Sequence, residues 1–360
     1  MINFVIVYSN MSNANNQLNI KHIYSNDILQ EINSSVINEL KSHLRGSQCL
    51  VACCFIDNFI RWLSLPFYKF DEDEYWSDAA EVKIYCPEDI PQVFDNLKRD
   101  WPHSIHTYFF LLNFMDWTEN SADVEFDFYC PNGDPTIGSV LAQTKFKGSD
   151  TFINYHCVDY ISCKAIHDGL KEFSDVNWSQ PLIFESIHER LIPELYKIIS
   201  EKGLKINKND RCYQLWLPPA VAKHVMVELQ SELYMMPLDA NHTEMVNKHW
   251  EYSGPGTSLI IKETLTHNGG LGVLFRENDT FAGWAVEQHY GGIGMLYIHP
   301  EYRRQGYATE LVKGMVSRLV DREIDPFALI EEHNQPSRLL FQRLKFESIC
   351  MVHWIRVQTP

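Results

Sequence analysis

The pattern of apolar and polar residues is easiest to interpret in the last third of the chain. Apolar residues alternate with others over 271–276 and over 281–288, and an Asn-Asp pair at 278–279 lies between the two runs. This pattern predicts a β-hairpin closed by a turn. After a further turn at 289–292, the apolar run 293–298 predicts a third strand.

The segment after that strand joins a compact turn, residues 303–308, to an amphipathic helix. Apolar residues recur at helical spacing from Leu311 to Val320. Gly306 has no Cβ to keep a bound group away from the backbone, and Arg303 and Arg304 add positive charge. A helix N-terminus carries about half a unit of positive charge, and its free amides point at one spot. The segment therefore predicts a cradle for an oxyanion such as a diphosphate.

The middle of the chain predicts a mixture of strands and helices. Alternating apolar residues over 136–160 indicate hairpin strands. A helix is predicted around Glu185 to Glu201, followed by a strand from Cys212 to Leu217. A Pro-Pro pair at 218–219 is typical of a helix start and predicts a second helix that reaches Leu229.

A faint internal repeat lies further upstream. Residues 40–87 and 97–131 each predict the end of a helix, a strand, a short helix with the string Asn-Phe-x-x-Trp, and a strand ending in Tyr-Cys-Pro. An acidic insert at 71–78 lengthens the first copy. Two coincidental aromatic patches are the alternative explanation.

Composition limits the classes of function. The chain has 360 residues, of which 45% are hydrophobic, so it can bury the cores of at least two ordinary domains. Its formal net charge of -16 disfavours general binding to nucleic acid or to anionic membranes. The two arginines of the 303–308 turn are therefore a local feature, suited to a small anionic ligand.

Cysteine usage and hydropathy bear on the compartment. The nine cysteines are interpreted mostly as buried thiols in a reducing compartment, and Cys157 and Cys163 lack partners at zinc-like spacing. No run of eighteen apolar residues is present, so no membrane-spanning helix is expected. Residues 1–30 hold one lysine and no arginine, which is a poor transit peptide and favours a cytoplasmic location.

The turn resembles the pyrophosphate loop of the GNAT superfamily of acyl-CoA-dependent N-acyltransferases. The motif of that loop is Arg or Gln, two residues, Gly, one residue, then Gly or Ala, and it corresponds here to Arg303, Gly306 and Ala308. Residues 327–346 resemble the next strand and helix of the superfamily. Over 232–360, on the segments LDANHTEMVNKHWEYSGPG and HPEYRRQG, the chain resembles the glycine N-acyltransferase family.

The resemblance implies an α+β fold, with a mixed α/β sheet and tandem GNAT-like domains. The carboxy-terminal domain, 232–360, is expected to hold the acyl-CoA loop and to begin with a strand at 234–238 and a helix containing 246–250. Residues 88–231 are expected to form a degenerate GNAT-like domain that shapes the acyl or amine pocket and binds no CoA. Residues 1–87 would be an added partial repeat of unassigned role.

The resemblance also implies where acyl-CoA, the acyl-donor co-substrate, binds. In the superfamily the strand at 293–298 parts from the strand at 327–333 because a bulge interrupts their ladder, and the active site is the gap. Unpaired backbone groups of the first strand then bind the pantetheine arm as an added strand would. The residues expected to bind acyl-CoA are Leu296, Tyr297, Ile298, Arg303, Arg304, Gln305, Gly306, Tyr307, Ala308, Asn334 and Phe341.

The general base is the open question. A thioester is already activated, so the enzyme has to hold an amine, remove its proton and stabilise the tetrahedral oxyanion. The glutamate that serves the glycine N-acyltransferases matches Gly292, which has no side chain. His289 and Glu287 are the nearest replacements, because a histidine can accept a proton near neutral pH and Glu287 would act after burial or through a water.

Three further positions bear on the chemistry of the candidate site. Glu331 and His333 lie on the neighbouring predicted strand and are alternative bases. Many GNAT enzymes place a tyrosine where this chain has Phe341, to protonate the leaving thiolate, and phenylalanine cannot donate a proton.

Two functions follow. The first is an acyl-CoA-dependent N-acyltransferase that acylates glycine, another amino acid or a small amine by direct transfer in a ternary complex. The second is a catalytically decayed module that binds CoA or another protein, which the absence of the glutamate and the tyrosine would favour. A peptide lysine acetyltransferase fits the fold but not the family resemblance. No metal, nucleic-acid partner or membrane span is expected, and family resemblance makes mitochondria the alternative compartment.

Overall fold

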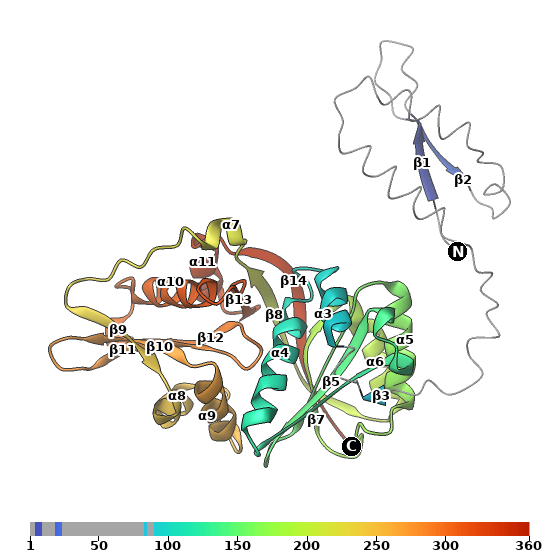
Figure 1. Ribbon diagram of the computed structural model, residues 1–360, viewed down its shortest axis with the longest axis horizontal. Helices are drawn as coiled ribbons and strands as arrows, with labels where there is room; N and C mark the ends of the chain where they lie inside the picture. Colours follow the sequence, from blue (N-terminus) through green and yellow to red (C-terminus); the bar gives the residue numbers. More distant parts are fainter. Residues whose placement is uncertain (1–3, 9–18, 24–82, 85–89, 360) are drawn as a thin grey trace, which may run out of the picture. The chain divides into compact units, whose positions relative to one another are not determined.

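The computed structural model describes residues 4–8, 19–23, 83–84 and 90–359, and the chain divides into two compact units, 1–75 and 76–360 (Figure 1). In the first unit, strands β1 (Phe4–Tyr8) and β2 (Asn19–Ile23) pair in antiparallel fashion. The first copy of the predicted repeat, 40–87, lies outside the described residues except for 83–84.

The second unit contains one order of elements twice: a strand, two helices, three antiparallel strands, a helix, a strand, a helix and a strand. We call 83–216 the amino-terminal half and 233–358 the carboxy-terminal half. The amino-terminal half consists of β3 (Lys83–Ile84), α3 (Ile90–Lys98), α4 (Ile105–Asn120), β4 (Val124–Cys130), β5 (Ser139–Phe146), β6 (Thr151–Cys157), α5 (Tyr160–Glu172), β7 (Leu182–His188), α6 (Ile192–Glu201) and β8 (Lys205–Trp216).

The carboxy-terminal half repeats this order after the short helix α7 (Pro219–Ala222). Its elements are β9 (Leu233–Leu238), α8 (Thr243–His249), α9 (Thr257–His267), β10 (Gly270–Phe275), β11 (Phe281–Glu287), β12 (Ile293–Ile298), α10 (Tyr307–Val320), β13 (Phe327–Glu331), α11 (Gln335–Arg343) and β14 (Glu347–Gln358).

The two halves exchange their last strands. The eight-stranded sheet has the order β13-β8-β14-β7-β6-β5-β4-β3, so β14 pairs with β7 of the amino-terminal half and β8 pairs with β13 of the carboxy-terminal half. The exchanged strands also pair with each other. A second sheet has the order β12-β11-β10-β9. Since β6 and β7 are parallel and the other pairs antiparallel, the predicted mixed α/β sheet is confirmed.

Helices cover both faces of each sheet (Figure 1). Neighbouring residues on a strand point to opposite faces, so Phe152 packs in the cluster that contains α4, whereas Ile153 packs in the cluster that contains α5 and α6. In the smaller sheet α10 lies on one side and α8 and α9 on the other. Trp117 and Phe114 of α4 are fully buried in this core. Burial of a large apolar side chain contributes about 1.5–3 kcal/mol, which holds α4 against the sheet.

The strands and helix predicted from 271 to 320 are found within a residue or two, and the hairpin over 136–160 is found as β5 and β6. Three other predictions were wrong. Residue 185 lies in strand β7, and the helix begins only at Ile192. The helix after the proline pair ends at Ala222 instead of Leu229. The strand predicted between 97 and 113 is absent, because α3 is followed directly by α4.

Candidate active site

The 303–308 turn forms a backbone cradle at the start of α10. Arg304 and Gly306 both have positive φ, 62° and 89°, and Gly306 is the N-cap of the helix without a side-chain capping hydrogen bond. The first N–H groups of a helix have no partner within it. A Cβ added to Gly306 would meet no described atom within 4 Å, so the left-handed backbone selects glycine here and the space in front of the amides is open.

The side chains of the cradle have separate roles. Arg303 is exposed, its Nε donates to the carbonyl of Ile298 at 3.0 Å, and its guanidinium carbon lies 5.9 Å from the centre of the Tyr297 ring. Tyr307 is buried in the core, and its hydroxyl donates to Gln305 Oε1 at 2.8 Å. Position 307 therefore offers a ligand its backbone rather than its side chain.

Strands β12 and β13 are split, as the resemblance implied. They belong to different sheets, and β12 is the edge strand of the smaller sheet within the described residues. A bulge bends β12, because Met295 has a φ of 45° and the pairing steps from Trp284 opposite Tyr297 to Val286 opposite Gly294. The free edge of β12 can accept an extended ligand.

A cavity of about 790 Å³ opens beside this edge. Leu296, Tyr297, Asn334 and Phe341 line it together, so the structure brings four of the residues expected to bind acyl-CoA into one site. Ile298 and the residues of the 303–308 turn are not among the residues that line this cavity. His289 lines it as well, and Glu287 does not.

His289 forms a buried pair with Glu185 of the other half. Its Nε2 lies 2.7 Å from Glu185 Oε1, and both residues are buried. Because a carboxylate accepts, we assign the ring proton to Nε2, which leaves Nδ1 with its lone pair. Nδ1 is buried and has no hydrogen-bond partner among the described residues. An imidazole held this way has the orientation of a general base.

Neighbouring groups fix the charge of Glu185. Burial alone would raise its pKa, but the charges and hydrogen bonds of His289 and His106 outweigh burial and lower the pKa to about 2. His106 Nε2 lies 3.3 Å from the same carboxylate oxygen. Burial lowers the pKa of His106, which opposes its ionisation. Glu185 is therefore ionised at neutral pH and stabilises positive charge on His289.

Residues of α4 and aromatic rings hold His289 in place. Asn113 Nδ2 donates to the carbonyl of His289 at 2.8 Å, and Asn268 Nδ2 donates to the carbonyl of Gln288 at 2.7 Å. Both bonds fix the turn between β11 and β12. Six aromatic rings lie with centroids 5.0–6.5 Å from the His289 ring, and they are Phe110, Phe114, Phe146, Phe152, Tyr290 and Trp354.

Glu287 occupies a different environment. It is buried and pairs with two arginines, Arg318 of α10 at 3.8 Å and Arg322, in the turn that follows α10, at 2.5 Å. Burial raises its pKa in spite of both arginines. Glu287 therefore contacts Arg318 of α10, whereas His289 lines the cavity.

The glycine at 292 is required by its surroundings. A Cβ there would lie 2.7 Å from Cε2 of the Tyr290 ring, so a glutamate side chain would displace that ring. Of the two alternative bases, Glu331 lines the cavity and His333, which pairs with it at 3.0 Å, is largely exposed. Burial raises the pKa of Glu331.

Sequence reasoning missed Glu185 and Asn113. Glu185 is the one acidic residue in the run LIFESIH, and every residue of that strand is buried. A carboxylate inside a continuous apolar run was the available signal. Asn113, Phe114 and Trp117 form the Asn-Phe-x-x-Trp string of the predicted repeat, and its asparagine contacts the turn that holds His289.

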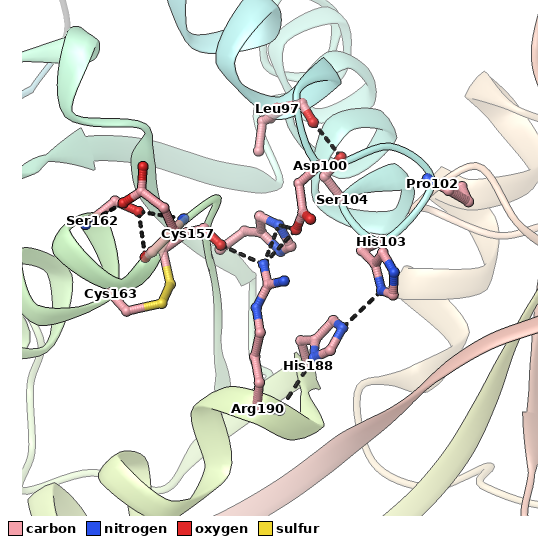
Figure 2. Close-up of polar contacts among 12 residues, drawn as sticks. Leu97, Asp100, Pro102, His103, Ser104, Cys157, Ser162, Cys163, His188 and Arg190 are labelled. Carbon is pink, nitrogen blue, oxygen red and sulfur yellow. Dashed lines mark hydrogen bonds and ion pairs between the residues drawn. A yellow bond between two sulfur atoms is a disulfide. The ribbon is translucent and has the colours of Figure 1, made fainter. Parts of the chain in front are cut away.

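A second polar cluster lies in the amino-terminal half (Figure 2). Arg190 pairs with Asp100 and donates to the carbonyl of Cys157. Cys157 and Cys163 form a disulfide, so the interpretation of these two as thiols was wrong. Cys130, Cys212 and Cys350 are buried free thiols.

Three atoms that can bind a metal lie within 4.8 Å of one another in this cluster, from His103, His188 and Cys350. The Arg190 backbone N–H donates to His188 Nδ1 at 3.2 Å, which assigns the ring proton of His188 to Nε2. His103 Nδ1, 3.0 Å away, accepts that proton, so the Nε2 lone pair that a metal would require is absent in this tautomer. The expectation that no metal is needed stays a prediction.

No helix in the described part of the chain has the length and apolar character needed to cross a membrane.

Comparison with known proteins agrees with this geometry. A family model described as "FR47-like protein" matches residues 270–355. Glycine N-acyltransferase-like protein 2 of Homo sapiens is 24% identical over 285 residues, which cover 75% of this chain and 95% of the human protein. Glycine N-acyltransferase of Bos taurus is 22% identical over 193 residues, which cover 48% of this chain and 65% of the bovine protein.

A crystal structure of a Drosophila protein matches the fold with a TM-score of 0.69 at 18% identity, covering 78% of this chain and 99% of the other. These findings show that the chain is similar to the glycine N-acyltransferases, and the structural match shows a shared fold. The resemblance to the glycine N-acyltransferases of the GNAT superfamily that was seen in the sequence is therefore confirmed.

Proposed function

We propose that this protein transfers an acyl group from acyl-CoA to the nitrogen of a small amine or amino acid. The observation that carries the proposal is the buried pair of His289 and Glu185, because His289 lines a cavity that also borders the free edge of β12, and its Nδ1 has no partner among the described residues. A proton acceptor and a donor-binding edge in one cavity are the two things that direct acyl transfer needs.

The cradle would bind the CoA diphosphate. The open amides at the start of α10, with Arg303 and Arg304 beside them, supply positive potential. The edge of β12 would pair with the pantetheine amides, and backbone N–H groups of the same strand would stabilise the oxyanion. Phe341 would pack beside the thioester as an apolar wall.

His289 would then act as general base in place of the missing glutamate. Nδ1 takes a proton from the ammonium form of the acceptor, and the ionised Glu185 stabilises the imidazolium that forms. The free amine attacks the thioester carbonyl, the C–S bond breaks as CoA leaves as a thiolate, and the nitrogen loses its second proton to that thiolate or to water. Water or backbone N–H groups would stabilise that thiolate, because Phe341 has no proton to give.

The cavity favours direct transfer over an acyl-enzyme. Cys212 is the cysteine that lines it, and burial, helped by Glu331 and Asp210, raises the pKa of its thiol to about 12. A thiol that stays protonated at neutral pH is a poor nucleophile. The amine therefore attacks acyl-CoA itself, within a ternary complex.

Release of the CoA thiol tests the proposal. The protein is assayed with acetyl-CoA, benzoyl-CoA and longer acyl-CoAs against glycine, other amino acids and small amines, and binding of CoA is followed separately by thermal shift. We expect thiol release with at least one pair. Arg303→Ala and Arg304→Ala should weaken CoA binding without abolishing turnover at saturation.

The competing proposal is a module that binds CoA without catalysis. Gly292 and Phe341 favour it, because both positions lack the groups that the family uses. If CoA stabilises the protein and no acceptor yields thiol, the N-acyltransferase proposal is overturned and the binding module remains.

A further inference from the structure

The acceptor side of the cavity is acidic. Four carboxylates line it, Asp150, Asp210, Glu251 and Glu331, whereas Arg356 is the one arginine or lysine among the lining residues that the structure describes. Asp150, Glu251 and Arg356 are exposed, whereas His289 is buried, at 7% exposure. The cavity therefore has a buried end with a base and an open end with negative charge.

Strand register shows that part of this charge is built into the sheet. Asp210 on β8 lies opposite Trp354 on β14, and Glu331 on β13 lies opposite Cys212, two residues further along β8. Because side chains two residues apart on a strand share a face, Asp210, Cys212 and Glu331 point to the same side. The raised pKa of Glu331 has Glu251 and Asp210 among its causes after burial, as expected for carboxylates near one another.

Aromatic rings accompany the carboxylates. Trp250, Tyr252 and Trp354 line the same cavity. Lys208 already places its ammonium 4.7 Å from the centre of the Tyr252 ring, and the same ammonium pairs with Asp210 at 2.7 Å. This wall therefore binds one cation of the protein itself by an ion pair and a cation–π contact.

An unpartnered acceptor at the buried end points to the ligand. His289 lines the cavity and its Nδ1 has no partner in the described residues, so one amine of a substrate would lose its proton to this residue. The remainder of the substrate would extend toward the carboxylates and rings. A carboxylate on that remainder, such as the one that glycine carries, would meet four carboxylates, of which Asp210 is already paired with Lys208, and Arg356.

We infer that the acceptor is an amine with a second positive charge, such as a diamine, rather than an amino acid with a free carboxylate. The inference rests on the proposed N-acyltransferase function and specifies its acceptor. One nitrogen is acylated at His289. The second stays cationic and binds Asp210, Glu331 and Glu251 with Trp354 beside it.

Three matched acceptors test the inference. 1,5-Diaminopentane, pentylamine and 5-aminopentanoate share a five-carbon amine and end in an ammonium, a methyl and a carboxylate group. With a fixed acyl-CoA, we expect kcat/KM for the diamine to exceed that for pentylamine by about tenfold, and 5-aminopentanoate to be poorer still. A preference for 5-aminopentanoate or glycine that Arg356→Gln removes would overturn the inference.

Variants locate the effect. Asp210→Asn and Glu331→Gln should each reduce the ratio of kcat/KM for the diamine to kcat/KM for pentylamine. Glu332→Gln is the matched control, because Glu332 is an exposed neighbour that pairs with Arg211 and does not line the cavity. If the two cavity variants behave like this control, the carboxylates do not bind the acceptor.

Binding measured without turnover separates the two proposals. Calorimetry of the CoA-loaded protein with the same three compounds should show the diamine binding most tightly. If no acceptor yields thiol but the diamine still binds preferentially, the transferase proposal fails and the acceptor inference stands. If thiol is released while the diamine has no advantage in binding or in kcat/KM, only the acceptor inference fails.

Discussion

The same turn of the fold occurs twice, and its two versions differ at the backbone amides. In the amino-terminal half, β6 leads into α5 through Asp159, whose carboxylate accepts the N–H of Ser162 at 2.8 Å in a capping box. In the carboxy-terminal half, β12 leads into α10 through Gly306, which has no side chain to cap the helix. One helix start is closed by its own carboxylate and the other is open to an external anion.

The two halves also differ in how the strand before each turn pairs with the strand after the helix. In the amino-terminal half, β6 and β7 are hydrogen-bonded from Thr151 opposite Leu182 to Ile153 opposite Phe184. In the carboxy-terminal half, β12 and β13 belong to separate sheets. If the carboxy-terminal half binds acyl-CoA as proposed, its site combines an uncapped helix with the free edge of a strand. In the amino-terminal half the helix is capped and β6 and β7 are paired over three residues, which supports the proposal that this half binds no CoA.

The largest expected effect tests whether the general base belongs to the carboxy-terminal half. His289→Ala should lower kcat by roughly 10²–10⁴-fold, because it removes the general base. Steady-state thiol release measures kcat, and thermal shift should show unchanged CoA binding. Glu287→Gln is the matched control and should keep kcat within a few fold, since Glu287 contacts α10 rather than the cavity. A larger loss in the control than in His289→Ala would reverse the two roles.

The next-largest effect tests what Glu185 of the amino-terminal half contributes to the site. Glu185→Gln should lower kcat by about 10²-fold, because the amide can no longer stabilise the imidazolium and can select the wrong tautomer of His289. The KM for acyl-CoA should change little. A pH profile of kcat distinguishes this role from a structural one, since removal of a charge beside the base should change the profile and a loss of packing should not. An unmoved profile would leave Glu185 with packing alone.

The same variant has a second consequence, for stability. The pKa of Glu185 is about 2 in the fold against a usual value near 4.5, so its ionised form stabilises the fold above about pH 4.5. That contribution is lost as the pH falls from about 4.5 toward 2. Urea unfolding across this range should therefore show a steeper fall in unfolding free energy for the natural protein than for Glu185→Gln. Parallel curves would contradict the assignment.

A smaller effect is expected when the turn before α10 receives an N-cap side chain like the one that begins α5. Gly306→Asp places a carboxylate at the N-cap of α10, as Asp159 does in α5, and Gly306→Asn places a neutral cap of the same size. Both residues tolerate positive φ better than most. The KM for acyl-CoA should be roughly tenfold higher with Asp than with Asn, because the charge repels the diphosphate. Equal KM values would mean that this helix start does not bind the anion.

The smallest effect is expected in the reciprocal change. Asp159→Ala should cost about 0.5–2 kcal/mol of unfolding free energy through loss of the cap, and kcat should not change. Ser162→Ala, at the other end of the capping box, is the matched control and should have a similar cost. Calorimetry should still find one CoA per chain. A second CoA in Asp159→Ala would show that the carboxylate alone had closed the amino-terminal half.

Local features of the fold were accessible from the sequence. The hairpin at 271–288, the strand at 293–298 and the helix after Gly306 follow from patterns that extend over a few neighbouring residues. β7 was misassigned because it is buried on both faces, so its residues do not alternate and Glu185 looked like part of a polar helix face. The exchange of β8 and β14 joins residues far apart in the sequence, which periodicity cannot report.

The candidate site was likewise predictable only where its residues are close together in the sequence. The cradle was predictable because its glycine, arginines and helix start lie within a few residues. His289 was one of two candidate bases, and nothing local to the sequence distinguishes it from Glu287. The distinction comes from Glu185, which is 104 positions away and reaches the site from the other half.

The exchanged strands have a consequence for how this protein is made. β7 ends at His188, and its neighbour β14 begins only at Glu347. The central pairs of the largest sheet therefore form only when two segments far apart in the sequence come together. Contacts of such high sequence separation slow folding and favour a single cooperative transition. Neither half can be excised as an autonomous module, because each would lose a strand from its interior and expose the ladder that the missing strand had satisfied.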